Sequence, residues 1–144
     1  MSQQKEYWLT EGKLHLPEIC QEQSITILTL PKAQATLVVT RAWDVQEGEE
    51  ARYLQQQLAK VKRDMKKFAA EEQQETLFGN LPAQEVAMRF ENQGVLVVQK
   101  LLVVRTDTHL MTLTFSRAGS FDPASLTVWQ AIKEGFIPAA GSEG

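Results

Sequence analysis

The segment VLVVQKLLVV, residues 95–104, is apolar at every position except Gln99 and Lys100. Because successive side chains of a β-strand point to opposite faces, a strand made from this segment has apolar residues on both faces. An antiparallel strand in a small protein usually buries one face and exposes the other to water. The segment therefore predicts a strand whose second face also needs cover, with the amide of Gln99 in the middle of one face.

The size and composition of the chain favour one domain without bound metal. The 144 residues are enough for one core, and we expect a single domain over residues 1–137 followed by a flexible tail at 138–144. A net charge of −3 gives no electrostatic reason to expect nucleic acid or an anionic membrane as a partner. The single cysteine, Cys20, excludes an internal disulfide, and no His/Cys spacing resembles a zinc site. We expect no cofactor.

The N-terminus, MSQQKEYWLT, lacks the apolar stretch of a signal peptide. No window approaches the roughly 20 apolar residues that a membrane-spanning helix needs. These features predict a soluble protein, and the lone cysteine suits a reducing cytoplasm.

Strand patterns dominate the chain. Short extended pieces flank a turn at Glu11 and Gly12, and a meander of three antiparallel strands is predicted near the C-terminus, with connections at 92–94 and 106–108. The full set of longer predicted strands is 24–30, 35–43, 84–90, 95–104 and 109–117.

Two segments have helical rather than strand periodicity. Apolar residues at steps of three and four predict an amphipathic helix over 49–68. A second helix is predicted over 121–136, with Asp122 as N-cap and Pro123 at its first position. The predicted fold is α+β: a curved antiparallel sheet with two helices that share one face.

If both helices cover one face, the apolar residues of the other face lack cover. We expect the inner sets to be Val86, Met88 and Phe90 in one strand and Met111, Leu113 and Phe115 in another. Each aliphatic side chain left in water forfeits roughly 1.5–3 kcal/mol relative to full burial. Three explanations are open: a dimer partner or a loop of this chain covers the face, the face binds an apolar ligand or helix, or the strand assignment is wrong.

Gln99 bears on this choice, because a buried amide without a partner costs on the order of 1–3 kcal/mol. The amide therefore suggests that a polar group of a bound segment meets it. A hydrogen bond to a neighbouring loop or a water explains it equally well.

The sequence does not predict an enzyme. His15 and His109 lie in predicted strands, and Cys20 has no basic cluster beside it to activate its thiol. No phosphate-binding loop and no set of nucleophile, base and orienting group can be assembled from the sequence.

Six motifs, in order, resemble a known family. They are YWLTEGKLHLPE, QSITILTLP, ATLVVTRAW, VVQKLLVV, HLMTLTFS and FDPASLTVWQAI, and they extend from about Tyr7 to Phe136. This order and spacing resemble the DcrB-related family and, within it, the Eag-type chaperones that accompany type VI secretion effectors.

The resemblance implies a fold like that of the photosystem protein PsbP, assembled as a homodimer. It also implies a cytoplasmic, non-enzymatic chaperone that shields the N-terminal transmembrane helices of an effector, of the PAAR or Rhs type, and helps to load it onto the VgrG spike. The alternative is a DcrB-like module of the cell envelope that binds an apolar ligand or a protein; the missing signal peptide argues against it.

The predicted cargo-binding residues come from two sources. Ile25 and Ile27 match the strand that lines the binding groove in the resembled family. The others follow mainly from strand alternation; they are Val38, Thr40, Gln57, Val97, Gln99 and Leu101.

Overall fold

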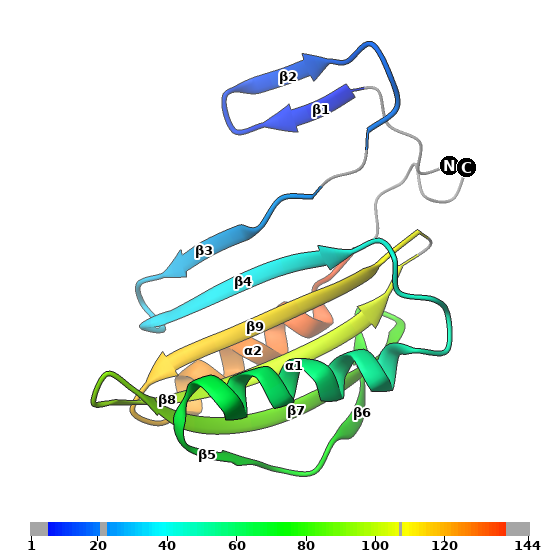
Figure 1. Cartoon of the computed structure of the whole chain (residues 1–144). Coiled ribbons are helices and arrows are strands. Elements are labelled where there is room, and N and C mark those ends of the chain that lie inside the picture. The colour runs from blue at the N-terminus through cyan, green and yellow to red at the C-terminus, as the bar shows by residue number, and fades with distance from the viewer. Residues whose placement is uncertain (1–5, 21–22, 107, 138–144) are drawn as a thin grey trace.

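The computed structural model describes residues 6–20, 23–106 and 108–137 (Figure 1). The predicted tail at 138–144 lies outside the described residues. In chain order the elements are β1 (Glu6–Leu9), β2 (Gly12–His15), β3 (Thr26–Leu30), β4 (Ala35–Ala42), α1 (Glu50–Asp64), β5 (Lys66–Ala70), β6 (Gln74–Phe78), β7 (Leu81–Asn92), β8 (Val95–Arg105), β9 (Leu110–Ala118) and α2 (Pro123–Glu134).

The main sheet has seven strands, and its paired strands are antiparallel. The order is β3-β4-β9-β8-β7-β5, with β6 also paired to β7. The predicted meander is β7-β8-β9, and its first connection has positive φ at both Gln93 and Gly94, as a tight hairpin turn requires. The predicted α+β class, with two helices and a large antiparallel sheet, is confirmed.

The two helices lie on opposite faces of this sheet, which corrects the prediction that they share one face (Figure 1). Leu54 of α1 packs in one core cluster, and Trp129 of α2 packs in another. We call the two sides the α1 face and the α2 face. The prediction failed because the two expected inner sets point in opposite directions: Val86, Met88 and Phe90 lie on the α1 face, whereas Met111, Leu113 and Phe115 lie on the α2 face.

Helix α1 is shorter than predicted. It ends at Asp64, and Met65 already has extended backbone angles. Residues 66–70 then form β5, whose register shifts between Lys66 and Ala69, with positive φ at Lys67. The apolar stripe continues to Phe68 because that side chain also packs in the α1 cluster, from a strand rather than from the helix. Strands β5 and β6 were not predicted.

Helix α2 is capped at its N-terminus and is held to the sheet by a largely buried ion pair. Asp122 accepts a hydrogen bond from the backbone N–H of Ser125, and Pro123 begins the helix, as predicted. Near the other end, Lys133 Nζ lies 2.8 Å from Glu85 Oε1, and Trp129 Nε1 donates to Glu85 Oε2 at 2.9 Å. These contacts fix α2 over the strands of the meander.

The first two strands form a separate two-stranded sheet. Figure 1 shows this hairpin standing away from the main sheet, beyond β3.

Candidate functional site

The two halves of β8 differ in burial, so the second apolar face of this strand is covered in one half only. Residues 101–104 are buried on both sides, because Leu101 and Val103 pack under α1 while Leu102 and Val104 pack with the α2 cluster. The chain's own helices therefore cover this half. In the first half, Val95 and Leu96 are exposed and residues 97–100 are half-buried.

Leu101, predicted to bind cargo, is a core residue. Its side chain is only 5% exposed, in the cluster that contains Leu54 of α1. Strand alternation placed it on the correct face, but the helix lies above it. It cannot contact a partner without displacement of α1.

Helix α1 covers only part of its face, and a row of paired residues shows where its cover ends. Ile27 of β3 pairs with Val38, Val38 with Thr114, Thr114 with Leu101, and Leu101 with Val86 of β7. Along this row Ile27 is 65% exposed, Val38 and Thr114 are half-buried, and the last two are in the core. Along this row the α1 face is thus covered at β7 and β8 and uncovered toward β3.

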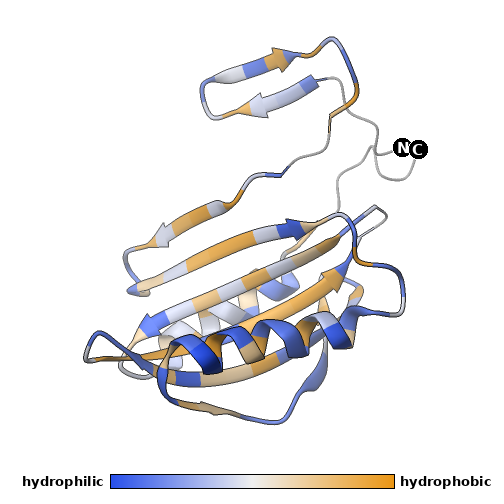
Figure 2. Ribbon diagram, in the orientation of Figure 1, coloured by the Kyte–Doolittle hydropathy of each residue, from blue (hydrophilic) through white to orange (hydrophobic). Residues whose placement is uncertain are grey.

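We call the uncovered part the open face. Figure 2 shows alternating apolar and neutral residues along β3 and β4, with no helix in front of them. Its members share the α1 face and incomplete burial: Ile27, Thr36, Val38, Thr40, Val97, Gln99, Thr114 and Ser116.

The opposite side of the same strands is a core. Leu37 of β4 and Phe115 of β9 are 6% and 0% exposed, and both pack in the α2 cluster. At the open face, β4 and the part of β9 from Thr114 onward are therefore buried on one face only. The open face is incompletely buried because no helix lies over it. Its strands pack well on their other face.

Three of the eight predicted cargo-binding residues are not members of the open face: Leu101 is a core residue, and Ile25 and Gln57 lie outside the strands that form this face. Ile25 lies just before β3 and is 64% exposed. Gln57 is half-buried on α1, and the helical rotation of about 100° per residue places it nearly opposite Gln55.

 Five of the predicted positions belong to the open face, Ile25 directly precedes the strand that carries Ile27, and Gln57 lies on helix α1. The five are Ile27, Val38, Thr40, Val97 and Gln99.

The Gln99 amide has a partner within the sheet. Its Nε2 donates to Ser116 Oγ at 2.9 Å, across the pair that the two residues form between β8 and β9. The hydrogen bond therefore goes to a neighbouring strand rather than to a loop. Nearby on the same face, Thr112 is 5% exposed, and its Oγ1 has no hydrogen-bond partner among the described residues.

An ion pair positions the start of α1 beside the sheet. Glu50 Oε2 lies 2.7 Å from Arg105 Nε, and Arg105 also donates to the backbone carbonyl of Gln46 at 2.8 Å. Burial raises the pKa of Glu50, but hydrogen bonds from Arg105 and from backbone N–H groups, together with the charge of Arg105, outweigh it, so the net pKa lies below the ordinary value of 4.5. The pair ties the helix to the end of β8.

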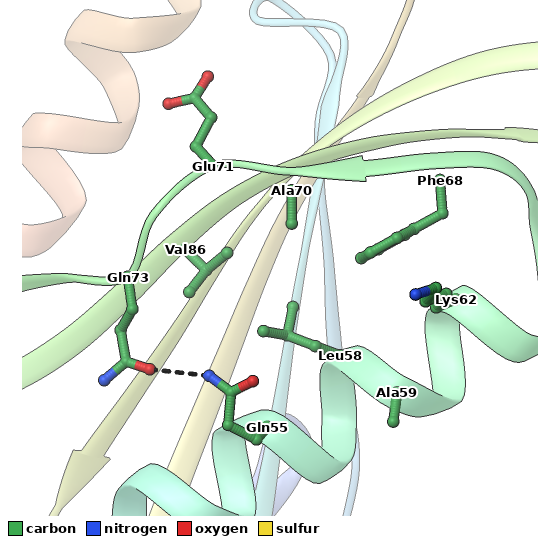
Figure 3. Close-up of a pocket in the computed structure, with 9 residues that line it drawn as sticks. All are labelled: Gln55, Leu58, Ala59, Lys62, Phe68, Ala70, Glu71, Gln73 and Val86. Atoms are coloured by element: carbon green, nitrogen blue, oxygen red, sulfur yellow. Dashed lines mark hydrogen bonds between the residues drawn. The ribbon is translucent and has the colours of Figure 1, made fainter.

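A pocket of about 350 Å³ lies on the other side of α1, between the helix and β5 (Figure 3). Leu58, Phe68 and Val86 give it apolar walls, and Gln55 Nε2 donates to Gln73 Oε1 at 3.1 Å across its mouth. None of the predicted cargo-binding residues lines it.

The residues considered for catalysis lie apart. His15 contacts Glu6 at 2.9 Å in the N-terminal hairpin, His109 stacks on Trp43 at a centroid distance of 4.2 Å, and Cys20 is a free thiol. Within the described residues, no group of three or more His, Cys, Asp or Glu side chains could hold a metal ion. Neither described helix has the length and apolar composition needed to cross a bilayer.

The fold defines an α+β protein with one helix on each face of a long antiparallel sheet. The sequence model of the DcrB family matches residues 11–135, and the chain belongs to that family.

Two solved structures are similar to this chain, and the first of them shares its fold. PA94 from Pseudomonas aeruginosa, a protein of unknown function, is 20% identical, with a TM-score of 0.70 over 93% of this chain and 96% of its own. LpqN from Mycobacterium tuberculosis, which is involved in cell envelope biogenesis, is 19% identical, with a TM-score of 0.45 over 78% of this chain and 68% of its own. No curated protein sequence is significantly similar to this chain.

Proposed function

We propose that this protein binds an apolar helical segment of another protein on its open face. The observation that carries the proposal is the row from Ile27 to Val86, in which one face of one sheet passes from 65% exposed to 1% exposed. Exposed aliphatic side chains grouped on one surface are typical of an interaction site.

The chemistry of the open face suits a helix from a membrane segment. Covering an exposed aliphatic side chain is worth roughly 1.5–3 kcal/mol, which favours association with an apolar partner. The hydroxyls of Thr40 and Thr114 and the amide of Gln99 lie among the aliphatic residues. Small and hydroxyl-bearing residues are also the ones that let membrane helices pack closely and form hydrogen bonds.

The proposed partner is the N-terminal transmembrane region of a type VI secretion effector of the PAAR or Rhs type. In this role the protein is a cytoplasmic, homodimeric, non-enzymatic chaperone that keeps the segment covered until the effector is loaded onto the VgrG spike. This finer proposal rests on the resemblance of the sequence motifs to Eag-type chaperones. Ile25, Ile27 and the other open-face residues are its proposed cargo-binding positions, with Gln57 at the border.

Membership of the DcrB family favours a second candidate, a module of the cell envelope that binds an apolar ligand or a protein. Both candidates use an apolar surface, but they differ in compartment and in partner. A free lipid and a transmembrane peptide therefore distinguish them.

The test is binding of a 20-residue transmembrane peptide of Leu, Ala and Ser, presented in detergent below its micelle concentration, to the wild-type protein and to Ile27→Asp. A charge at this position must be desolvated when a helix covers it, so we expect affinity to fall at least tenfold, the equivalent of about 1.4 kcal/mol. Co-purification with the N-terminal region of a PAAR or Rhs effector should be lost in the same variant.

Leu77→Asp is the matched control, because Leu77 is 58% exposed on β6, which lies near the opposite edge of the sheet from β3. It should bind as the wild type does. Undiminished peptide binding by a folded Ile27→Asp protein would overturn the assignment of the open face. Binding of a fatty acid with no binding of the peptide or the effector would instead support the envelope candidate.

A further inference from the structure

The α2 face has an incompletely covered region of its own, and the burial of successive rows shows where it begins. Leu102 and Leu113 pair with each other on this face and are 0% and 3% exposed. Two residues back along β8, Lys100 is half-buried; in the row after that, Val98 is half-buried and its partner Arg89 is exposed. Cover of the α2 face therefore ends toward the turn between β7 and β8.

A pocket of about 450 Å³ lies in this region, and we call it the cationic pocket. Val98 and Phe121 contribute to its apolar lining, and Phe121 directly precedes the N-cap of α2. The Phe121 ring stacks on the buried ring of Phe115 at a centroid distance of 5.7 Å, so packing in the core fixes this wall. A volume of this order is typical of sites for small molecules.

The two cations of the pocket lack acidic partners, unlike their neighbour on the same face. Arg117 lies 3.2 Å from the carboxylate of Asp122. Arg89 and Lys100 line the pocket, and neither forms an ion pair within the described part of the chain. The Lys100 ammonium instead lies over the Phe121 ring, 5.7 Å from its centroid. Both cations are therefore available to a negatively charged ligand.

Glu71 is the one acidic side chain among the described residues that line the pocket. It is exposed and pairs with neither cation. Figure 3 shows its carboxylate directed to the opposite side of the chain from the side chain of Ala70. With Arg89 and Lys100 opposed by one carboxylate, the lining has a net positive charge, and a cleft with charges of one sign attracts ligands of the other.

We propose that the cationic pocket binds a small organic anion with an apolar body, of about the size of a bicyclic aromatic acid. The acid group lies between Arg89 and Lys100, and the body packs on Val98 and Phe121. One negative charge on the ligand balances the net charge of the lining. An uncharged ligand would displace water from the two cations without replacing its interactions, so the site favours the acid.

This site goes beyond the proposed function and does not rest on it. Val97 and Val98 are adjacent in β8 and point to opposite faces. Val97 belongs to the open face and Val98 to the cationic pocket. A ligand in the pocket therefore does not occupy the surface proposed for the helix.

The first test removes the charges. Anilinonaphthalene sulfonate and phenylnaphthylamine share a ring system, but only the first carries an acid group, and the binding of both is followed by fluorescence. Arg89→Gln with Lys100→Gln should raise the dissociation constant of the sulfonate at least tenfold and leave that of the uncharged probe within threefold. Lys62→Gln, at an exposed lysine that lines the other pocket, is the matched control and should leave both within threefold.

A wild-type protein without saturable binding of the sulfonate overturns the proposal. Equal changes for the two probes in the double variant also overturn it, as does a loss in Lys62→Gln as large as in the double variant. Glu71→Gln removes the opposing charge and should bind the sulfonate about threefold more tightly.

The second test fills the pocket without changing its charge. Ala69 is exposed on β5, pairs with Arg89 and lines the pocket, so Ala69→Trp should weaken binding of the sulfonate at least tenfold. Ala59→Trp, at an exposed alanine of the other pocket, is its control and should bind within threefold of the wild type. Unchanged binding by Ala69→Trp overturns the location.

Competition identifies the class of ligand. Naphthoate should displace the sulfonate at a concentration at least tenfold lower than naphthol does. A hexaglutamate peptide that displaces it better than naphthoate would overturn the assignment to small molecules.

Ile27→Asp separates this proposal from the open face. It should bind the sulfonate as the wild type does, and loss of sulfonate binding in this variant would place the anion on the open face and overturn the proposal. Loss of the transmembrane peptide with intact sulfonate binding concerns the open face alone, so the two proposals fail separately.

Discussion

The covered and the open parts of the α1 face belong to one sheet and one pattern of alternation, yet they differ in how deeply their side chains are buried. Over β7 and β8, Leu54 of α1 is 0% exposed and the strand residues beneath it, Val86 and Leu101, are 1% and 5% exposed. Over β3, the residue of the same row, Ile27, is 65% exposed. The difference arises because helix α1 lies over the covered part, whereas no helix lies over the open part.

The two parts also differ in composition. The covered part is built from aliphatic, methionine and phenylalanine side chains, whereas the open part mixes Ile27 and Val38 with threonines, Ser116 and Gln99. Hydroxyls and amides remain hydrated at low cost when a partner is absent, and a fully aliphatic surface does not. The covered part therefore stabilises the fold. The mixed composition of the open part supports the proposed binding role.

The sharpest way to break this comparison is to truncate one residue in each part. Leu54→Ala removes a fully buried side chain and leaves a cavity, so we expect the free energy of unfolding to fall by about 3 kcal/mol. Ile27→Ala removes a mainly exposed side chain and should change it by no more than about 0.5 kcal/mol. Urea denaturation of the two variants measures both values. Equal losses would show that the open part is also a core.

A smaller effect is expected where α1 is tied to β8. The folded-state pKa of Glu50 is lowered, so its carboxylate stabilises the fold above its ordinary pKa of 4.5, and this contribution is lost as the pH falls through the lower, folded-state pKa. Glu50→Gln should cost on the order of 1 kcal/mol at neutral pH, because the ion pair with Arg105 is only partly buried.

The measurement is urea denaturation of Glu50→Gln and wild type at neutral pH and well below pH 4.5, where the difference should disappear. Glu47→Gln, at an exposed residue of the preceding loop, is the control and should change little. A cost that stays the same at both pH values would mean that the side chain acts through its shape or its hydrogen bonds rather than through its charge.

The sequence predicted the strands of the sheet better than the layers around it. Alternation and turn residues located the meander and the turn at Gly94, and both are local properties of the chain. The faces covered by the helices depend on how strands far apart in the sequence pair with each other. That register decides that Val86 and Phe115 lie on opposite faces, and no local pattern contains it.

The candidate site shows the same division. Alternation correctly grouped Val97, Gln99 and Leu101 on one face, but the end of α1's cover falls between them, and Leu101 is core. Strand β5 was missed because its residues continue the helical apolar stripe as far as Phe68. The apolar stripe correctly identified residues that pack together. It wrongly predicted that all of them belong to one helix, because Phe68 lies in a strand.

The smallest expected effect concerns Gln99, the polar residue within the apolar segment. Gln99→Leu removes the hydrogen bond to Ser116, but the serine hydroxyl is half-buried and can bond to water instead. We therefore expect the free energy of unfolding to change by less than about 0.5 kcal/mol. A double-mutant cycle with Ser116→Ala, followed by urea denaturation, isolates the pair. A coupling well above about 1 kcal/mol would mean that the amide mainly holds β8 to β9. A weak coupling leaves the amide free to exchange its partner for a polar group of a bound helix, which is consistent with the proposed binding of a helix on the open face.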